Sequence, residues 1–206
     1  RWLTPLLLAR LAEAYPKVRL IVVDATTTSL LPQVATGSLD LAIVNLPATD
    51  PDVDTEVLFE EEHVILLSKE HPLASRDSVH LEELADVPLL LEPRGTGFRD
   101  DLEADAERAG ITLTAQAEVD GMRLLASLAY QGFGAAILPA SAIVELTDGT
   151  WATVALEGTS PRTVGLATPR RGRLSAPAKA SIEVVRRVLA DEVPGRPGLR
   201  LATARP

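Results

Sequence analysis

The chain has 206 residues, of which 46% are hydrophobic and 24% charged, and its formal net charge is −9 at pH 7. This length suits one large domain or two small ones, and the absence of cysteine from the sequence excludes thiol catalysis, disulfide redox sensing and thiolate metal sites. The acidic charge disfavours direct binding of this chain to nucleic acid, which requires a clustered basic face.

The first part of the chain alternates between predicted helices and strands. Leu20–Val23 is apolar on both faces, as a central parallel strand should be, and we expect it to pair with Leu39–Val44. Gly37 is placed to end the helix that connects them. In order, the predicted elements are a helix that begins at Thr4 and ends at Tyr15, the strand Leu20–Val23, a helix over Leu30–Thr36, and strands over Leu39–Val44, Glu56–Glu60 and Val64–Leu67.

A second set of elements follows the polar loop Ser68–Arg76. In order, these are a helix over Leu81–Ala85, the strand Pro88–Leu91, a helix over Phe98–Gly110, the strand Ala115–Val119, a helix over Met122–Gln131, and strands over Ala135–Leu138 and Thr153–Leu156. The strand Val164–Ala167 should then return to the first lobe, before a helix capped by Ser175, so two crossings of the chain form a hinge. Residues 194–206 lack periodicity, and we expect them to form a flexible tail.

Two segments of the sequence look alike. VVDATTTSLLPQVATGSLDLAIV and VDGMRLLASLAYQGFGAAILP each run from a strand end through a turn and a leucine-containing helix to a glycine and a buried strand. This pattern predicts two similar α/β lobes. Because helix N-termini and the carboxyl ends of parallel strands face a shared crevice in such sheets, we expect a small ligand to bind there.

Three candidate ligand-binding residues lie in the first lobe. Thr27 and Thr28 belong to a hydroxyl run between a buried strand and a helix, where hydroxyls and amides can bind an anion. Asn45 follows a strand at a carboxyl end, and its amide can both donate and accept. The alternatives are that the hydroxyls only cap the helix and that Asn45 is an ordinary loop residue.

The second lobe offers four more candidates. Arg94, Thr96 and Gly97 precede a helix and supply a cation, a hydroxyl and flexible backbone amides for a carboxylate. Met122 opens the next helix and offers an adaptable apolar wall. Pairing of Arg94 with Glu92 and core packing of Met122 are the alternatives.

Catalysis finds little support in the sequence. His63, His71 and His80 lack metal-ligand spacing, and Ser141 has no nucleophile-elbow motif around it. The acidic run over residues 60–62 is typical of a solvated turn. We therefore expect no enzyme, no catalytic residue, no metal and no cofactor.

Four segments follow one another along the chain: AEAYPKVRLIVVDATTTSLLPQVATGSLDLAIV, LFEEEHVILLSKEHPLA, LEELADVPLLL and GFGAAILP. Their order and spacing resemble the effector-binding domain of LysR-type transcriptional regulators, from Trp2 to Leu189. The resemblance implies a two-lobed type 2 periplasmic-binding-protein fold with a cleft between two Rossmann-like subdomains. Lobe I would comprise residues 1–66 with 162–193, and lobe II residues 67–161.

The same resemblance implies a function. It implies that a small-molecule effector, a small anion or carboxylate, contacts the loop that contains Thr96, and that the domain forms a homodimer or homotetramer. Promoter DNA would bind only through an N-terminal winged helix-turn-helix domain, which this chain lacks, as it lacks the family's first strand. The apolar runs are too short to span a bilayer, so we expect a cytoplasmic protein with no membrane partner.

A second candidate has the same fold. A free-standing periplasmic solute-binding protein that delivers a small anion to a transporter would have a similar cleft. The two candidates differ in what precedes Arg1, a basic helix-turn-helix or a signal peptide, and a monomer in solution would favour the carrier.

Overall fold

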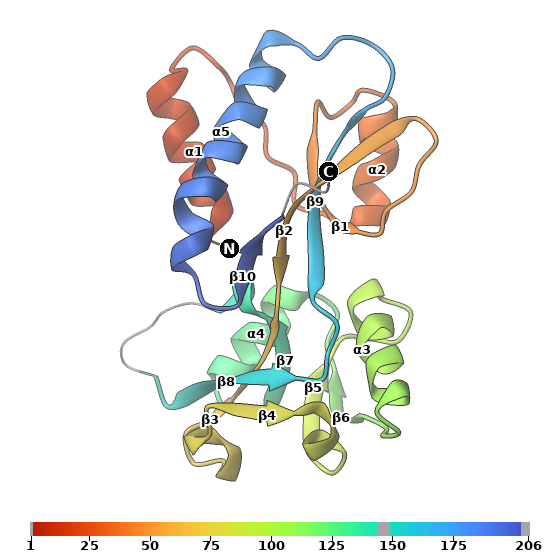
Figure 1. Cartoon of the computed structure of the whole chain (residues 1–206), viewed down its shortest axis with the longest axis vertical. Helices are drawn as coiled ribbons and strands as arrows, with labels where there is room; N and C mark the ends of the chain where they lie inside the picture. Colours follow the sequence, from red (N-terminus) through yellow and green to blue (C-terminus); the bar gives the residue numbers. More distant parts are fainter. Residues whose placement is uncertain (1, 144–148, 203–206) are drawn as a thin grey trace. The chain divides into compact units, whose positions relative to one another are not determined.

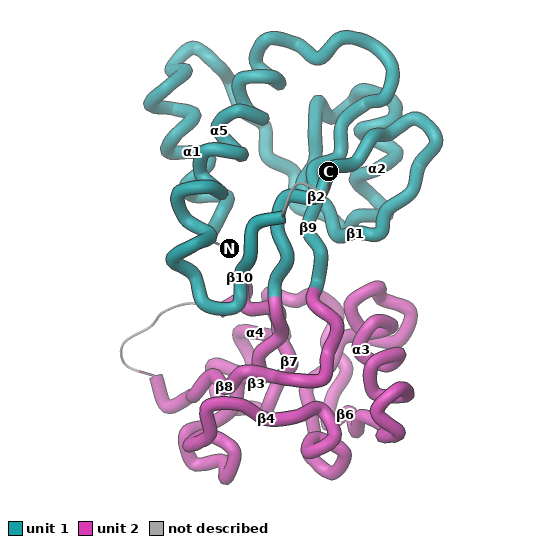
Figure 2. Tube along the Cα trace, in the orientation of Figure 1, with its two compact units in different colours: residues 1–61, 162–206 teal, residues 62–161 magenta. Residues whose placement is uncertain are grey.

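The computed structural model describes residues 2–143 and 149–202, and the chain divides into two compact units. Unit 1 comprises residues 1–61 and 162–206, and unit 2 comprises residues 62–161 (Figure 2). The family resemblance predicts the first boundary after Leu66. In the structure, strand β3 (His63–Ser68) pairs with strands of unit 2, so the boundary lies after Glu61.

Most elements form where the hydrophobic period predicts them. Helix α5 (Ala176–Glu192) begins after Ser175, whose Oγ accepts a hydrogen bond from the main-chain N–H of Ala178 at 3.2 Å. Its buried residues include the apolar stripe of Ile182, Val185, Val188 and Leu189. The predicted helix over Leu81–Ala85 is instead a short 3-10 turn, η2 (Leu81–Leu84).

The sheet of unit 1 is antiparallel throughout. Its strand order is β1 (Ala42–Leu46), β9 (Arg162–Pro169), β2 (Val53–Glu61), β10 (Leu199–Leu201). Strand β9 lies between β1 and β2 and is buried from Val164 to Ala167 on both faces. This strand is therefore the centre of unit 1.

Helices cover both faces of this sheet (Figure 1). Helix α2 (Thr27–Ala35) packs on the face that includes Ala167 of β9 and Val44 of β1. Helices α1 (Leu3–Ala14) and α5 pack against each other on the opposite side. Alternate residues of β9 thus contribute to two different cores.

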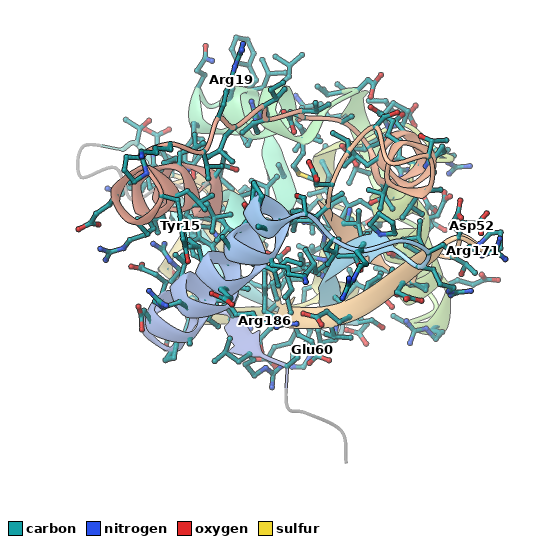
Figure 3. All side chains as sticks on the ribbon, turned by 90° about the horizontal axis from the view of Figure 1, so that it is seen from above. Tyr15, Arg19, Asp52, Glu60, Arg171 and Arg186 are labelled. Atoms are coloured by element: carbon teal, nitrogen blue, oxygen red, sulfur yellow. The ribbon has the colours of Figure 1, made fainter. Side chains whose placement is uncertain are left out.

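Ion pairs join β2 to the elements next to it. Arg186 of α5 donates to both carboxylate oxygens of Glu56 at 2.9 Å. Just before the start of β2, Arg171 lies 3.9 Å from Asp52, and Figure 3 labels these two neighbouring side chains. Such exposed pairs contribute little stability individually.

Leu20–Val23 contradicts the prediction of a buried central strand. The segment forms no strand in the structure, and its side chains are exposed, with Ile21 at 78%. Strand β1 pairs antiparallel with β9 instead of parallel with this segment. Because no described strand pairs with Leu20–Val23, its backbone groups lack the ladder that a buried strand needs.

The predicted flexible tail also differs from the structure. Leu199–Leu201 forms β10 on the edge of β2, and the main-chain N–H of Ala202 donates to Leu58 O at 3.1 Å. Short 3-10 turn η4 (Val193–Gly195) connects α5 to this strand. The edge of β2 offers unpaired backbone groups, which a short alternating segment can satisfy. Residues 203–206 of the predicted tail lie outside the described residues.

The sheet of unit 2 mixes parallel and antiparallel pairs. Its order is β4 (Ser78–His80), β8 (Trp151–Glu157), β3, β7 (Ala135–Pro139), β5 (Pro88–Leu91), β6 (Thr114–Glu118). Strands β7, β5 and β6 are mutually parallel neighbours. The carboxyl ends of these three strands therefore lie at one edge of the sheet.

Two cores lie on opposite faces of this sheet. Helix α3 (Gly97–Arg108) packs Leu102 and Ala106 with Leu89 and Leu91 of β5. Helix α4 (Met122–Tyr130) packs on the other face, against Leu90. The alternation along β5 explains why an uninterrupted apolar run forms this strand. Short 3-10 turns complete the unit: η1 (Pro72–Ser75), η2 and η3 (Ala140–Ala142).

A capping box fixes the start of η2. The main-chain N–H of His80 donates to Glu83 Oε1 at 3.0 Å, and Arg76 pairs with the same carboxylate. These two contacts lower the pKa of Glu83 below its ordinary value. The short turn is thereby connected to the segment that precedes β4.

Asp105 anchors the segment that leaves unit 2. Its side chain on α3 is 2% exposed and pairs with Arg108. The main-chain N–H of Ser160 donates to Asp105 Oδ2 at 2.8 Å, and the Ser160 hydroxyl donates to Oδ1 at 3.0 Å. A buried carboxylate with these partners fixes residue 160 against α3.

Replacing Asp105 by Ala should lower the free energy of unfolding of unit 2. Two hydrogen bonds to a buried charge are lost and Ser160 loses its acceptor, so we expect a loss of about 2–4 kcal/mol. Chemical denaturation followed by circular dichroism measures this loss. Glu107→Ala, at an exposed position of the same helix, is the matched control. Equal stability of the two variants would contradict the anchoring role of Asp105.

Gly165 allows β1 and β2 to approach β9. A Cβ atom at this position would lie 2.5 Å from Leu46 Cδ1 and 2.8 Å from the main-chain oxygen of Glu56. The oxygen belongs to the neighbouring strand and cannot move without breaking the ladder. Only glycine therefore fits at this position without a steric clash.

Gly165→Ala should destabilise unit 1 by about 1–3 kcal/mol, because the added methyl group overpacks the centre of the sheet. The measurement is the midpoint of thermal unfolding. Gly195→Ala serves as the control, since a Cβ there has nothing within 4 Å. If Gly165→Ala matches this control, the close approach of the strands does not limit stability.

Candidate functional site

Three polar side chains from separate parts of the sequence meet in unit 1. Asn45 lies on β1, and its main-chain N–H donates to Thr27 Oγ1 of α2 at 3.0 Å. The Asn45 side-chain oxygen Oδ1 accepts a hydrogen bond from Nη2 of Arg162, the first residue of β9. The structure thus brings together two of the predicted site residues, Thr27 and Asn45, and adds Arg162.

A buried carboxylate holds Arg162. Glu61, the last residue of β2, is 1% exposed, and its Oε1 lies 2.9 Å from Arg162 Nη1. The prediction that residues 60–62 form a solvated run is therefore wrong for Glu61, although Glu60 and Glu62 are exposed. Because side chains alternate along a strand, Glu61 shares the buried face of Phe59.

The other hydroxyls of the run over residues 26–29 bond to one another. Thr28 is exposed, and its Oγ1 lies 3.0 Å from Thr26 Oγ1. Thr26 is the N-cap residue of α2, and its hydroxyl donates to Ser29 Oγ at 3.0 Å. The side chain of Thr26 forms no capping bond to the helix backbone, so capping is not its role.

The predicted loop of unit 2 precedes α3. Thr96 is the N-cap residue, and its hydroxyl donates to the main-chain oxygen of Pro93 at 2.9 Å. The main-chain N–H of Gly95 donates to Asp100 Oδ1 at 3.0 Å. Gly97, the first residue of α3, has open space where a side chain would lie. These bonds hold the loop close to its own helix.

Acidic residues surround Arg94. Its side chain is 68% exposed, and Nη2 lies 3.7 Å from Glu103 Oε1. A hollow beside Arg94 is lined by the carboxylates of Asp100, Glu103 and Glu107. In this conformation Arg94 therefore faces carboxylates, which repel an anionic ligand.

A second arginine of this region is buried. Arg99 is 1% exposed, its Nη2 lies 2.6 Å from Glu103 Oε1, and its Nη1 donates to the main-chain oxygen of Glu92 at 3.0 Å. The sequence does not predict Arg99 or Arg162 as a site residue, because the sequence around an arginine does not indicate whether its side chain is buried. Arg99 fixes the first turn of α3 beneath the loop.

Met122 lies at the same edge of the unit 2 sheet as this loop. It opens α4, just after β6, and the loop follows β5, which is parallel to β6. The main-chain N–H of Val119 donates to Leu91 O at 2.8 Å, which joins the two strand ends. Met122 is partly buried and packs against the core under α4, in agreement with the core-packing alternative.

The histidines contact neighbouring protein groups. His63 is 3% exposed, its Nδ1 lies 3.1 Å from Thr159 Oγ1, and its ring meets that of Phe98 edge-on at 5.3 Å. His71 accepts from a main-chain N–H at the start of η1, and His80 lies 3.0 Å from Glu157. Among residues 2–143 and 149–202, no cluster of three or more His, Asp or Glu side chains is placed to hold a metal ion.

No helix within the described part of the chain combines the length and the apolar character needed to cross a bilayer.

Comparison with known proteins identifies the family. The family model "LysR substrate binding domain" matches residues 1–190. The transcriptional dual regulator GltC of Bacillus subtilis is 27% identical over 185 residues, which are 89% of this chain and 62% of GltC. The chain therefore spans less than two thirds of that relative.

Solved structures agree with this result. The effector-binding domain of QuiR in complex with shikimate superposes with a TM-score of 0.79 at 21% identity, covering 93% of this chain and 92% of that one. The effector-binding domain of BenM with benzoate gives a TM-score of 0.78 at 23% identity, covering 92% and 87%. The predicted fold class is confirmed, and the chain belongs to the LysR substrate-binding domain family.

Proposed function

We propose that this chain is the effector-sensing and oligomerisation domain of a LysR-type transcriptional regulator and that its effector is a small carboxylate or another small anion. The observation that supports the ligand class is the hydrogen-bonded group of Thr27, Asn45 and Arg162, which offers donors at the end of β1. Shikimate and benzoate, in the two similar structures, are carboxylates.

The proposed ligand contacts come from both units. In unit 1 they are Thr27, Thr28 and Asn45; in unit 2 they are Arg94, Thr96, Gly97 and Met122. A ligand that contacts both sets favours the arrangement of units in which it binds best. Such coupling is typically about 1–3 kcal/mol, which suffices to change how a regulator engages DNA.

The proposal includes partners beyond the effector. We propose a cytoplasmic homodimer or homotetramer that reaches promoter DNA through an N-terminal domain and performs no catalysis. Exposed apolar side chains, Leu8 of α1 at 39% and Leu124 of α4 at 55%, support an oligomer contact, whereas Leu125, the next residue of α4, is buried in the core. The solute-carrier alternative is not favoured, because GltC, a relative of this chain, is a transcriptional regulator.

Two residues that occur once in the sequence provide a direct test. Asn45 is the only asparagine and Met122 the only methionine, and they lie in different units. In NMR spectra, the Asn45 side-chain amide and the Met122 methyl group each give one probe without further assignment. We expect a bound carboxylate effector to shift both signals with the same dissociation constant.

The control for this titration is the group of glutamines. The side-chain amides of Gln33, Gln116 and Gln131 lie outside the proposed site and should keep their positions. A ligand that shifts Asn45 without Met122, or Met122 without Asn45, would contradict contact with both units. Failure of every small carboxylate and phosphate tested to shift either signal would contradict effector sensing.

Thr96→Val and Arg94→Ala should weaken binding of the same ligand without unfolding unit 2. Loss of the Thr96 hydroxyl removes one hydrogen-bonding group, so we expect affinity to fall about 3- to 10-fold by isothermal titration calorimetry. Arg94 first has to leave Glu103, so its removal should cost less. Unchanged affinity in both variants would remove this loop from the site.

A further inference from the structure

The contact between Arg162 and Asn45 determines which way the Asn45 amide faces. A guanidinium group carries only donors, so the atom of Asn45 that meets Arg162 must be the oxygen, as the structure has it. The NH₂ group of the same side chain then faces away from Arg162. Asn45 therefore presents donors, and not its carbonyl oxygen, to any ligand beside it.

We propose that Arg162 is a positioning residue that fixes Asn45 as a hydrogen-bond donor, and that this donor makes the unit 1 part of the site select a carboxylate over the corresponding amide. The proposal rests on the proposed function, since it concerns the same effector site. It adds a residue, Arg162, and a physical basis for ligand choice.

Glu61 makes this orientation rigid. The buried Glu61 carboxylate accepts from Arg162 Nη1 at 2.9 Å, while Nη2 serves Asn45. Because the guanidinium group is planar, two partners on two different nitrogens fix both its position and its plane. Glu61 is 1% exposed and Arg162 24% exposed, so water cannot easily replace this carboxylate as the partner of Arg162.

Thr27 contributes a donor of the same kind. Its oxygen accepts from the main-chain N–H of Asn45 at 3.0 Å through one lone pair, and its hydroxyl proton remains able to donate to a ligand. A carboxylate has only acceptors and satisfies both groups. A primary amide has an NH₂ group in place of one oxygen. When this group faces the NH₂ group of Asn45, two donors meet and one hydrogen bond is lost. Since Glu61 already balances the charge of Arg162, donor geometry and not net charge decides the selection.

Asn45→Asp is the first test, because it keeps the shape of the side chain while it replaces the NH₂ donor by an oxygen and adds one negative charge. The introduced carboxylate can still accept from Arg162, so the free energy of unfolding should not decrease. Its second oxygen replaces the NH₂ group, so binding of a carboxylate should fall at least about tenfold. The probes are acetate, benzoate and shikimate, each compared with its primary amide by calorimetry. If Asn45 served only to hold Arg162, Asn45→Asp would retain the affinity of the wild type.

Arg162→Lys tests the positioning role itself. Lysine keeps a positive charge for Glu61, so the unit should fold, but a single ammonium group lacks the planar fork that holds Asn45 as well. We expect the ratio of carboxylate to amide affinity to fall at least about threefold toward one. A merely structural role would lower both affinities together and leave the ratio unchanged. Arg186→Lys, at the exposed pair with Glu56, is the matched control and should leave the ratio unchanged.

The outcomes separate this inference from the proposed function. In one outcome, a carboxylate binds and shifts the Met122 methyl signal, but the ratio of carboxylate to amide affinity is the same in Asn45→Asp, Arg162→Lys and the wild type. This outcome overturns the positioning role and leaves effector sensing in place. If the wild type binds the amides more tightly than the carboxylates, or binds none of the carboxylates, the proposal that the effector is a carboxylate is overturned. A reduced ratio in both variants, with the Arg186→Lys ratio unchanged, supports the inference.

Discussion

Burial of β9 on both faces and along both edges is the constraint on which unit 1 depends. The strand must accept β1 on one side and β2 on the other while α2 packs on one of its faces. Only a residue without a side chain fits at Gly165, where Leu46 and Glu56 approach. The register that results pairs Arg162 with Glu61 and Asn45 with Val164, so the candidate site follows from the packing of the sheet.

Unit 2 obtains its candidate residues from a different constraint. Parallel β5 and β6 end at the same edge, so the helices that follow them, α3 and α4, both begin there. The buried side chains of Arg99 and Asp105 then fix α3, one at its first turn and the other against Ser160. Loop residues next to such a fixed helix have a defined position even though they are exposed.

The sequence predicts those parts of the structure in which burial follows a simple period, as in α5 and β5. Leu20–Val23 has the same pattern as β5 but remains exposed, because an apolar pattern does not specify which strand it pairs with. Thr27 and Asn45 are recognisable from their places beside predicted elements. Glu61 and Arg162 are 101 residues apart, and each alone reads as an ordinary surface charge. Only the register of β2 with β9 brings these two together.

The two parts of the proposed site differ in how far they are formed before a ligand arrives. In unit 1, Glu61, Arg162, Asn45 and Thr27 already hold one another, so binding requires little rearrangement. In unit 2, Arg94 pairs with Glu103, and the Thr96 hydroxyl donates to the main-chain oxygen of Pro93. These groups must leave their partners to reach a ligand, and a ligand can shift a conformational equilibrium only where its contacts differ between states. On our proposal, unit 1 therefore supplies selection, and the loop before α3 supplies the conformational response.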